Sequence, residues 1–174
     1  YNSFRGRIVR IRMGYLLDVH REQEIYDGQI VPQIPKHVAP HTTYVAALWS
    51  VLTRLRRPDA SRYPNSDVGT IVAALTPLEK ADLLADGTVP SRFDADQAKL
   101  LASAVADVER EGASVSDYEG ISGASPREIR MLLLDAAADY DEACVSPVTL
   151  LQRMAEFCER DDYEFLKAQP DGPY

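Results

Sequence analysis

The sequence predicts a mainly α protein, a helical bundle preceded by one β-strand. Apolar residues recur at spacings of three and four along most of the 174 residues, which is the period of an amphipathic helix. Capping residues such as Ser, Thr and Asp stand before these segments, and several of them are followed at once by proline. One short stretch near the start instead alternates apolar and polar residues, as a strand does.

The predicted strand covers residues 7–13, RIVRIRM. Val9, Ile11 and Met13 fall on one face, and arginines occupy most of the other. Because a lone strand is not stable, we expect its sheet partners to come from another part of a longer protein.

Capping signals and apolar spacing place the expected helices. TPLEKADLLADG is the most compact signature, because Thr76 and Glu79 can form a capping box, Pro77 suits the first helical position, and Gly87 can end the helix. In chain order, the expected helices cover 18 to about 25 or 28, 42–56, 66–74, 76–87, 94 to about 111, and two segments that begin at Ser125 and Ser146. Loops are expected at the prolines after residue 30, at SRYPNSD and at the glycine-rich EGASVSDYEGISG.

The same spacing predicts which helical faces point inward. The expected inward residues of the last helix are Val148, Leu151, Met154 and Cys158, with Arg153 exposed. Helix 42–56 should bury a stripe of Tyr44, Val45, Leu48, Val51, Leu52 and Leu55. Its last turn carries Arg54, followed by Arg56 and Arg57, where the helix dipole favours cations.

Composition limits the possible partners. The net charge of −8 argues against a nucleic-acid binder built on bulk charge, so nucleic acid is not an expected partner. Residues 1–17 nevertheless hold four arginines and no acid, which leaves three readings open: an anionic-ligand patch, a nucleic-acid arm or ion pairs at a sheet edge. Two cysteines, no membrane-length apolar run and no signal-peptide h-region lead us to expect a reducing, cytoplasmic location with no membrane partner.

The sequence contains no complete set of catalytic residues that we recognise. It has no phosphate-binding P-loop, no G-x-S-x-G, no H-E-x-x-H and no protein-kinase H-R-D. His37 and His41 lie four apart, but Pro40 and the loop setting argue against a helical metal pair, and we expect no metal site. The acidic pairs Asp161 with Asp162 and Glu22 with Glu24 resemble acid/base couples, but we expect them to lie on a solvated surface, because no other catalytic residue accompanies them.

One arginine is out of place. In GASPRE, Ser125 and Glu128 form a predicted capping box and Pro126 takes the first helical position. Arg127 then puts a cation in the first turn, where the exposed N–H groups favour anions instead. Either it reaches a neighbouring carboxylate, or it faces a bound anion that the helix start also faces.

Several long segments resemble a known family. The segments are FRGRIVRIRMGYLLDVHREQEIY, KHVAPHTTYVAALWSVLTRL, LTPLEKADLLADG and YEGISGASPREIRMLLLDAA, followed by SPVTLL and YEFL. In this order they resemble PrkA-type serine protein kinases, bacterial proteins built on an AAA+ ATPase module. The resemblance implies that residues 1–16 end the ATPase core, with the arginine-finger region and last strand. Residues 17–174 would then form the helical lid and a family-specific extension, with 31–115 resembling an insertion.

The resemblance also implies roles for individual residues. Phe4, Gly6 and Arg7 are similar to the element that carries the arginine finger in related unfoldases, so Arg7 is the implied catalytic finger and Arg5 its alternate. GASPRE is similar to the sensor-2 motif, which implies nucleotide binding by Arg127 and Ser125.

The implied activity is ATP-dependent phosphoryl transfer to protein by a ring-type homo-oligomer of the whole protein. The cofactors would be ATP and Mg²⁺, neither bound tightly by this chain, because the Walker motifs should lie before Tyr1. The chain by itself should be inactive for the same reason. Two alternatives stay open: a helical protein-interaction domain with no nucleotide role, and the lid of an ATP-dependent protein-remodelling motor.

Overall fold

The computed structural model describes residues 13–109, 120–139 and 143–159, and this part is mainly helical, as the sequence predicts. Of the strand expected over 7–13, only Met13 falls within the described residues. The α-helices are α2 (Val19–Ile25), α3 (Thr42–Arg54), α4 (Ser66–Ala73), α5 (Pro77–Asp86), α6 (Ala95–Glu109), α7 (Pro126–Ala138) and α8 (Pro147–Cys158). A π-helical turn, Tyr26–Ile30, and a 3-10 turn, Val31–Gln33, continue α2, and a further 3-10 turn spans Ala60–Arg62.

Helix starts lie where the capping residues predict them. The side chain of Asp18 accepts hydrogen bonds from the first turn of α2, and Ser146 does the same for α8. Thr76 and Ser125 each form a complete capping box with the glutamate three residues on. Gly87 ends α5 in the left-handed conformation, with a φ of 68°.

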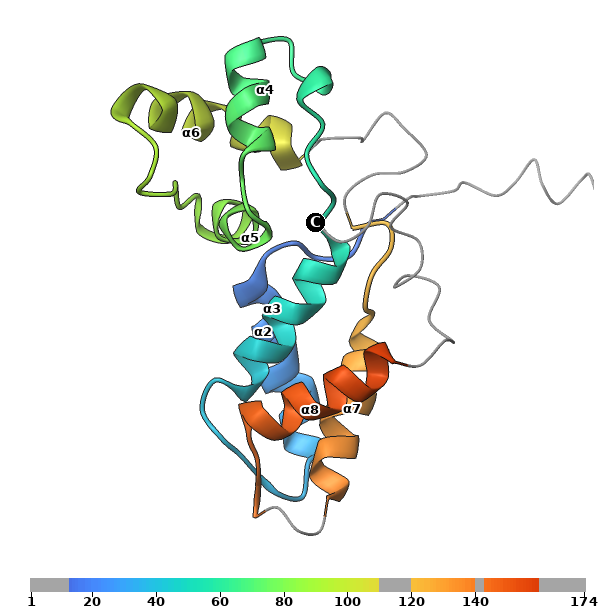
Figure 1. The fold of residues 1–174 in the computed structure, drawn as a ribbon. Coiled ribbons are helices and arrows are strands. Elements are labelled where there is room, and N and C mark those ends of the chain that lie inside the picture. Colours follow the sequence, from blue (N-terminus) through green and yellow to red (C-terminus); the bar gives the residue numbers. More distant parts are fainter. Residues whose placement is uncertain (1–12, 110–119, 140–142, 160–174) are drawn as a thin grey trace, which may run out of the picture.

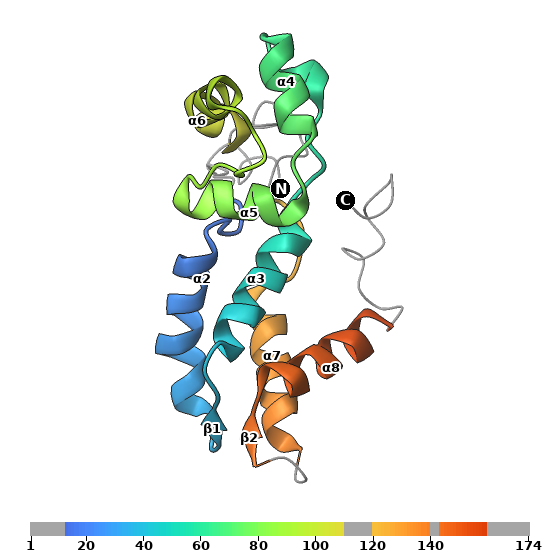
Figure 2. The same ribbon diagram turned by 60° about the vertical axis from the view of Figure 1, so that its left-hand side comes forward.

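The largest core joins helices from both halves of the described chain. Helices α2 and α3 pack with α7 and α8 in one lobe, and Figures 1 and 2 show the four helices together. Its buried members include Val51 and Leu55 of α3, Ile129 and Leu133 of α7, and Leu150 of α8.

A smaller core lies between α4, α5 and α6 in the other lobe of Figure 1. Helix α5 contributes to both cores, because Ala81 packs into the larger one and Leu83 into the smaller one. The stretch 31–115 is therefore divided: α3 is part of the larger core, whereas α4 and α6 build the smaller one.

A two-stranded parallel sheet ties two loops together at the foot of the larger lobe (Figure 2). Strand β1 (His37–Val38) pairs with β2 (Cys144–Val145), with His37 opposite Cys144. The Ala39 N–H continues the ladder by donating to the Val145 carbonyl at 2.9 Å. This sheet was not expected from the sequence, because strands of two residues have no periodicity to detect.

The inward face predicted for α8 is wrong. Val148 and Leu151 are 66% and 52% exposed and Cys158 is also exposed, whereas Leu150, Met154 and Phe157 point into the core. The two apolar rows share Met154 and both have helical spacing, so the sequence pattern alone could not choose between them. Arg153 was expected to be exposed, but it is only 30% exposed and forms ion pairs with Asp139 and Glu156.

The stripe predicted for α3 is confirmed at Val51 and Leu55, which are buried in the core. At its other positions it is wrong, because the buried face of this helix is rotated away from them. Its fully buried face combines small residues with one arginine: Thr42, Thr43, Ala46, Ala47, Ser50, Val51 and Arg54. Tyr44, Leu48 and Leu52 are only partly buried at the edge of the core. Small side chains on the inner face allow α2 to pack closely against α3.

Candidate functional site

The start of α7 is the part of the described structure where the sequence predicts a ligand. The Ser125 hydroxyl accepts from the Glu128 N–H, and a Glu128 oxygen accepts from the Ser125 N–H at 2.6 Å and from its hydroxyl at 2.8 Å. This capping box satisfies N–H groups at the helix start. Ser125 thus has a structural role in the helix cap.

Arg127 is exposed on the first turn of α7. Among the residues that the structure describes, none forms an ion pair or a hydrogen bond with its guanidinium. Arg130, one turn further along, is also exposed, but it donates to Gln33 at 2.6 Å. The neighbouring-carboxylate explanation for Arg127 therefore finds no partner in the described part of the chain.

The loop before α7 lies against the C-terminal end of α3 at Gly123 and against Tyr15 at Gly120, and both glycines make these close approaches possible. Gly120 and Gly123 have φ angles of +73° and +118°. A Cβ on Gly123 would lie 2.6 Å from Arg54 Cγ and 2.8 Å from the Thr53 carbonyl oxygen. Only glycine can adopt this backbone and leave room for α3.

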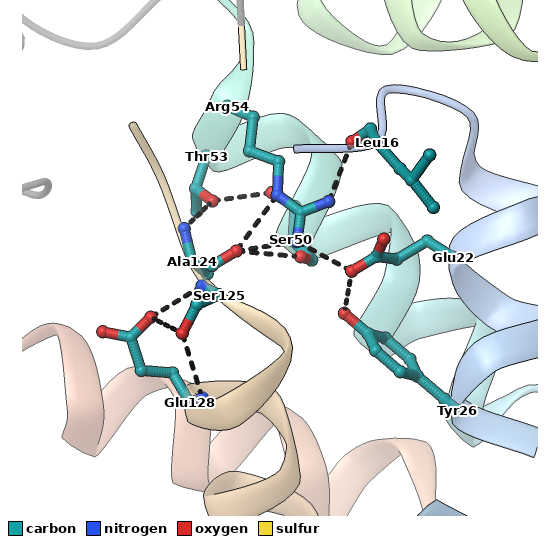
Figure 3. Close-up of polar contacts among 9 residues, drawn as sticks. All are labelled: Leu16, Glu22, Tyr26, Ser50, Thr53, Arg54, Ala124, Ser125 and Glu128. Atoms are coloured by element: carbon teal, nitrogen blue, oxygen red, sulfur yellow. Dashed lines mark hydrogen bonds and ion pairs between the residues drawn. The ribbon is translucent and has the colours of Figure 1, made fainter. Parts of the chain in front are cut away.

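Arg54 is the centre of a buried polar cluster behind the start of α7 (Figure 3). Its Nε and Nη2 donate to the Ala124 carbonyl at 3.0 and 2.7 Å, and its Nη1 donates to the Leu16 carbonyl at 2.8 Å. Nη2 also lies 2.7 Å from a Glu22 oxygen in an ion pair. One side chain from α3 therefore holds α2, the segment before α2 and the loop before α7.

Three more side chains complete this cluster. The Tyr26 hydroxyl donates to Glu22 at 2.6 Å, and Thr53 Oγ1 accepts from the Ala124 N–H at 2.8 Å. Ser50 donates to the Ala124 carbonyl at 3.4 Å. Burial and the Glu22 carboxylate raise the pKa of the Tyr26 phenol, so this hydroxyl remains a donor.

The segment before α2 also contacts this cluster. The Tyr15 N–H donates to the Gly120 carbonyl at 2.8 Å, and the Gly120 N–H donates to the Arg54 carbonyl at 3.3 Å. The Arg54 guanidinium lies 4.9 Å from the centre of the Tyr15 ring.

Two expectations from the sequence are wrong here: Arg54 was assigned to the dipole at the end of α3, and Glu22 to a solvated surface, whereas both are buried. A signal was present: Arg54 lies three residues after Val51 and seven after Ala47, on a face otherwise made of small and apolar residues. A cation on such a face indicates a buried partner, and the acid is Glu22, three residues after the buried Val19.

The two predicted finger residues, Arg7 and Arg5, lie outside the described residues, so only Arg127 and Ser125 have a structural setting here. Within the described ranges, no group of three His, Cys, Asp or Glu side chains is placed to hold a metal ion. Among the helices of residues 13–109, 120–139 and 143–159, none combines the length and the hydropathy that a membrane span needs.

Comparison with known proteins gives two family matches. Residues 1–62 match the PrkA AAA domain, and residues 78–169 match the PrkA serine protein kinase C-terminal domain. The ATP-dependent protease PrkA of Bacillus subtilis (strain 168) is 39% identical to the chain over 61 residues, a match that covers 34% of this chain and 10% of that protein. No solved structure matches the chain.

Proposed function

The chain belongs to the PrkA family, and we propose that it supplies the nucleotide-responsive lid of an ATP-hydrolysing AAA protein of that family. In this proposal the whole protein binds ATP and Mg²⁺ through its AAA domain. The chain described here contributes the helix that faces the bound phosphates.

Arg127 carries the proposal. It is exposed, it lies in the first turn of a well-capped helix, and it has no ion pair among the described residues. A guanidinium beside a helix start combines bidentate hydrogen bonding with the positive end of the helix dipole, and both favour phosphate. A fixed cation near the terminal phosphate would stabilise the charge that develops during phosphoryl transfer.

Arg7 is the proposed second cation. By its resemblance to the finger element of related ATPases, it would reach the nucleotide bound by a neighbouring subunit, with Arg5 as the alternate. A finger that acts on a neighbour requires a ring-type homo-oligomer of the whole protein. Arg127 would then act within one subunit and Arg7 between subunits.

The proposed output is phosphorylation of a protein substrate, in line with the name of the matched C-terminal domain. A second candidate, ATP-driven remodelling of proteins for degradation, is favoured by the name of the Bacillus relative. Both would use the lid in the same way. Transfer of labelled γ-phosphate to protein and ATP-dependent loss of a protein substrate would distinguish the two.

The experiment for the lid role is ATP turnover by the full-length protein with Arg127→Ala. We expect turnover to fall about tenfold or more, because one transition-state contact is removed. Arg130→Ala is the matched control, since it is exposed on the same helix but binds Gln33; Arg153 is unsuitable because it is ion-paired. Wild-type turnover in Arg127→Ala would favour a helical interaction domain with no nucleotide role.

A further inference from the structure

We infer that Arg54 is a positioning residue that holds the start of α7, and with it Arg127, against the segment that leads into α2. The inference rests on the proposed function for its effect on ATP turnover. The contacts that support it all join described residues of this chain, so they do not depend on that proposal.

Arg54 and Thr53 together bind the backbone of Ala124, the residue just before the Ser125 cap. Its carbonyl accepts two hydrogen bonds from Arg54, and its N–H donates to Thr53, so both polar groups of this residue are bound to α3. Since α7 begins two residues later, α3 fixes the position of the helix start. Arg127 lies in that first turn.

Arg54 also binds the segment before α2. The same guanidinium binds the Leu16 carbonyl and lies over the Tyr15 ring, and the Tyr15 N–H binds Gly120 at the other end of the loop. Residues 13–16 and 120–125 are thus held by one side chain and by direct backbone contact. A shift of either segment must move the other or break these bonds.

These contacts require an arginine at position 54. Arg54 uses Nε, Nη1 and Nη2 on three different oxygens, an arrangement that the planar guanidinium permits and a lysine ammonium cannot reproduce. A buried ion pair is weak evidence for stability, because well-packed apolar residues often stabilise a core as well. We therefore assign the cluster to orientation.

The segments that Arg54 joins match different parts of the family. Leu16, Glu22 and Arg54 lie in the region that matches the AAA domain, whereas Ala124 and α7 lie in the region that matches the C-terminal domain. The cluster is therefore a joint between the two regions. A movement of the AAA domain that reaches residues 13–16 would pass through Arg54 to the start of α7.

The test uses the full-length protein with Arg54→Lys and Thr53→Val, each alone and combined with Arg127→Ala. Amide hydrogen exchange reports on the joint, and kcat and KM for ATP report on its consequence. We expect exchange to rise about tenfold in residues 13–16 and 120–125 together. We expect kcat to fall about tenfold when Arg127 is present and to change little once it is absent, because the effect acts through that residue.

The control is Arg57→Ala, an exposed arginine just beyond α3, which should leave exchange and kcat unchanged. Faster exchange in only one of the two segments would contradict the inference that Arg54 couples residues 13–16 to residues 120–125. An equal loss of kcat with and without Arg127 would show a general structural defect and overturn the positioning role.

Failure of the proposed function has a different signature. In that case Arg127→Ala turns over ATP like wild type while exchange still rises in both segments of Arg54→Lys. If Arg54→Lys does not fold, Thr53→Val decides alone. It keeps Arg54 and the side-chain shape, and it removes only the Thr53 hydroxyl, which accepts from the Ala124 N–H and donates to the Ser50 carbonyl within α3.

Discussion

Arg54 and Glu22 form an ion pair in which Nη2 lies 2.7 Å from Oε1, with 0% and 1% of the two side chains exposed. The pair lies on facing helices, α3 and α2, inside the larger core. Arg54→Leu is expected to lower the free energy of unfolding by about 3–5 kcal/mol, because it leaves a buried carboxylate unpaired. Urea denaturation followed by circular dichroism measures the change.

Arg21→Ala is the control for this prediction, since Arg21 forms an exposed ion pair with Asp18. It should cost less than about 1 kcal/mol. Adding Glu22→Leu to Arg54→Leu should restore part of the lost stability, because no unpaired charge then remains. A loss from Arg54→Leu as small as that from Arg21→Ala would contradict the burial of the pair.

Gly123→Ala is expected to destabilise the protein by about 1–3 kcal/mol, because its φ of +118° is strained for any side chain. The new Cβ would also collide with α3 at Arg54 and Thr53. Gly28→Ala is the matched control, since a Cβ there meets nothing within 4 Å. It should be neutral or stabilising by up to about 1 kcal/mol. Thermal unfolding of both variants tests the prediction, which fails if they behave alike.

Truncation of the two neighbouring leucines of α8 should lower the stability by very different amounts. Leu150 is fully buried, so Leu150→Ala should cost about 2–5 kcal/mol through lost packing and a cavity. Leu151 is about half exposed, so Leu151→Ala should change the free energy of unfolding by less than about 0.5 kcal/mol. If urea denaturation shows a larger loss of stability for Leu151→Ala than for Leu150→Ala, then Leu151 points into the core, as the sequence pattern indicated.

Glu79 should make stability depend on pH in the acid range. Hydrogen bonds from Arg92, at 2.7 and 2.8 Å, lower the pKa of this carboxyl from 4.5 to about 2. Because the folded-state pKa lies below the unfolded one, the charged form stabilises the fold above pH 4.5. This contribution is lost as the pH falls toward about 2.

Glu79→Gln measures this contribution. The difference in unfolding free energy from wild type should be largest near neutral pH and should shrink across that window. Glu24→Gln, which alters an exposed carboxylate of α2, should show a smaller change. A difference between wild type and Glu79→Gln that stays constant from pH 7 to pH 2 would refute the assignment.

The sequence predicts the helix starts well because their signals are local. Asp18, Thr76, Ser125 and Ser146 each bond to backbone within three residues, so their capping roles do not depend on the rest of the fold. Proline at the first position of α5, α7 and α8 adds a second local signal.

The features that the sequence did not predict depend on distant partners. Arg54 and Ala124 are 70 residues apart in the chain, and His37 and Cys144 of the small sheet are further apart still. The rotated faces of α3 and α8 follow from which helices pack on them. Arg127 was singled out from its local misfit, and its proposed role stays a prediction.

The positions of the two cores along the chain determine when each can form during synthesis on the ribosome. The smaller core draws its buried residues from Tyr63 to Val108, so it can close as soon as that segment has emerged. The larger core needs α7 and α8 to cover α2 and α3, so those first helices leave the exit tunnel long before their partners exist. Throughout that interval Glu22 and Arg54 can meet each other but not Ala124, and the nascent chain exposes an apolar surface that a chaperone could bind.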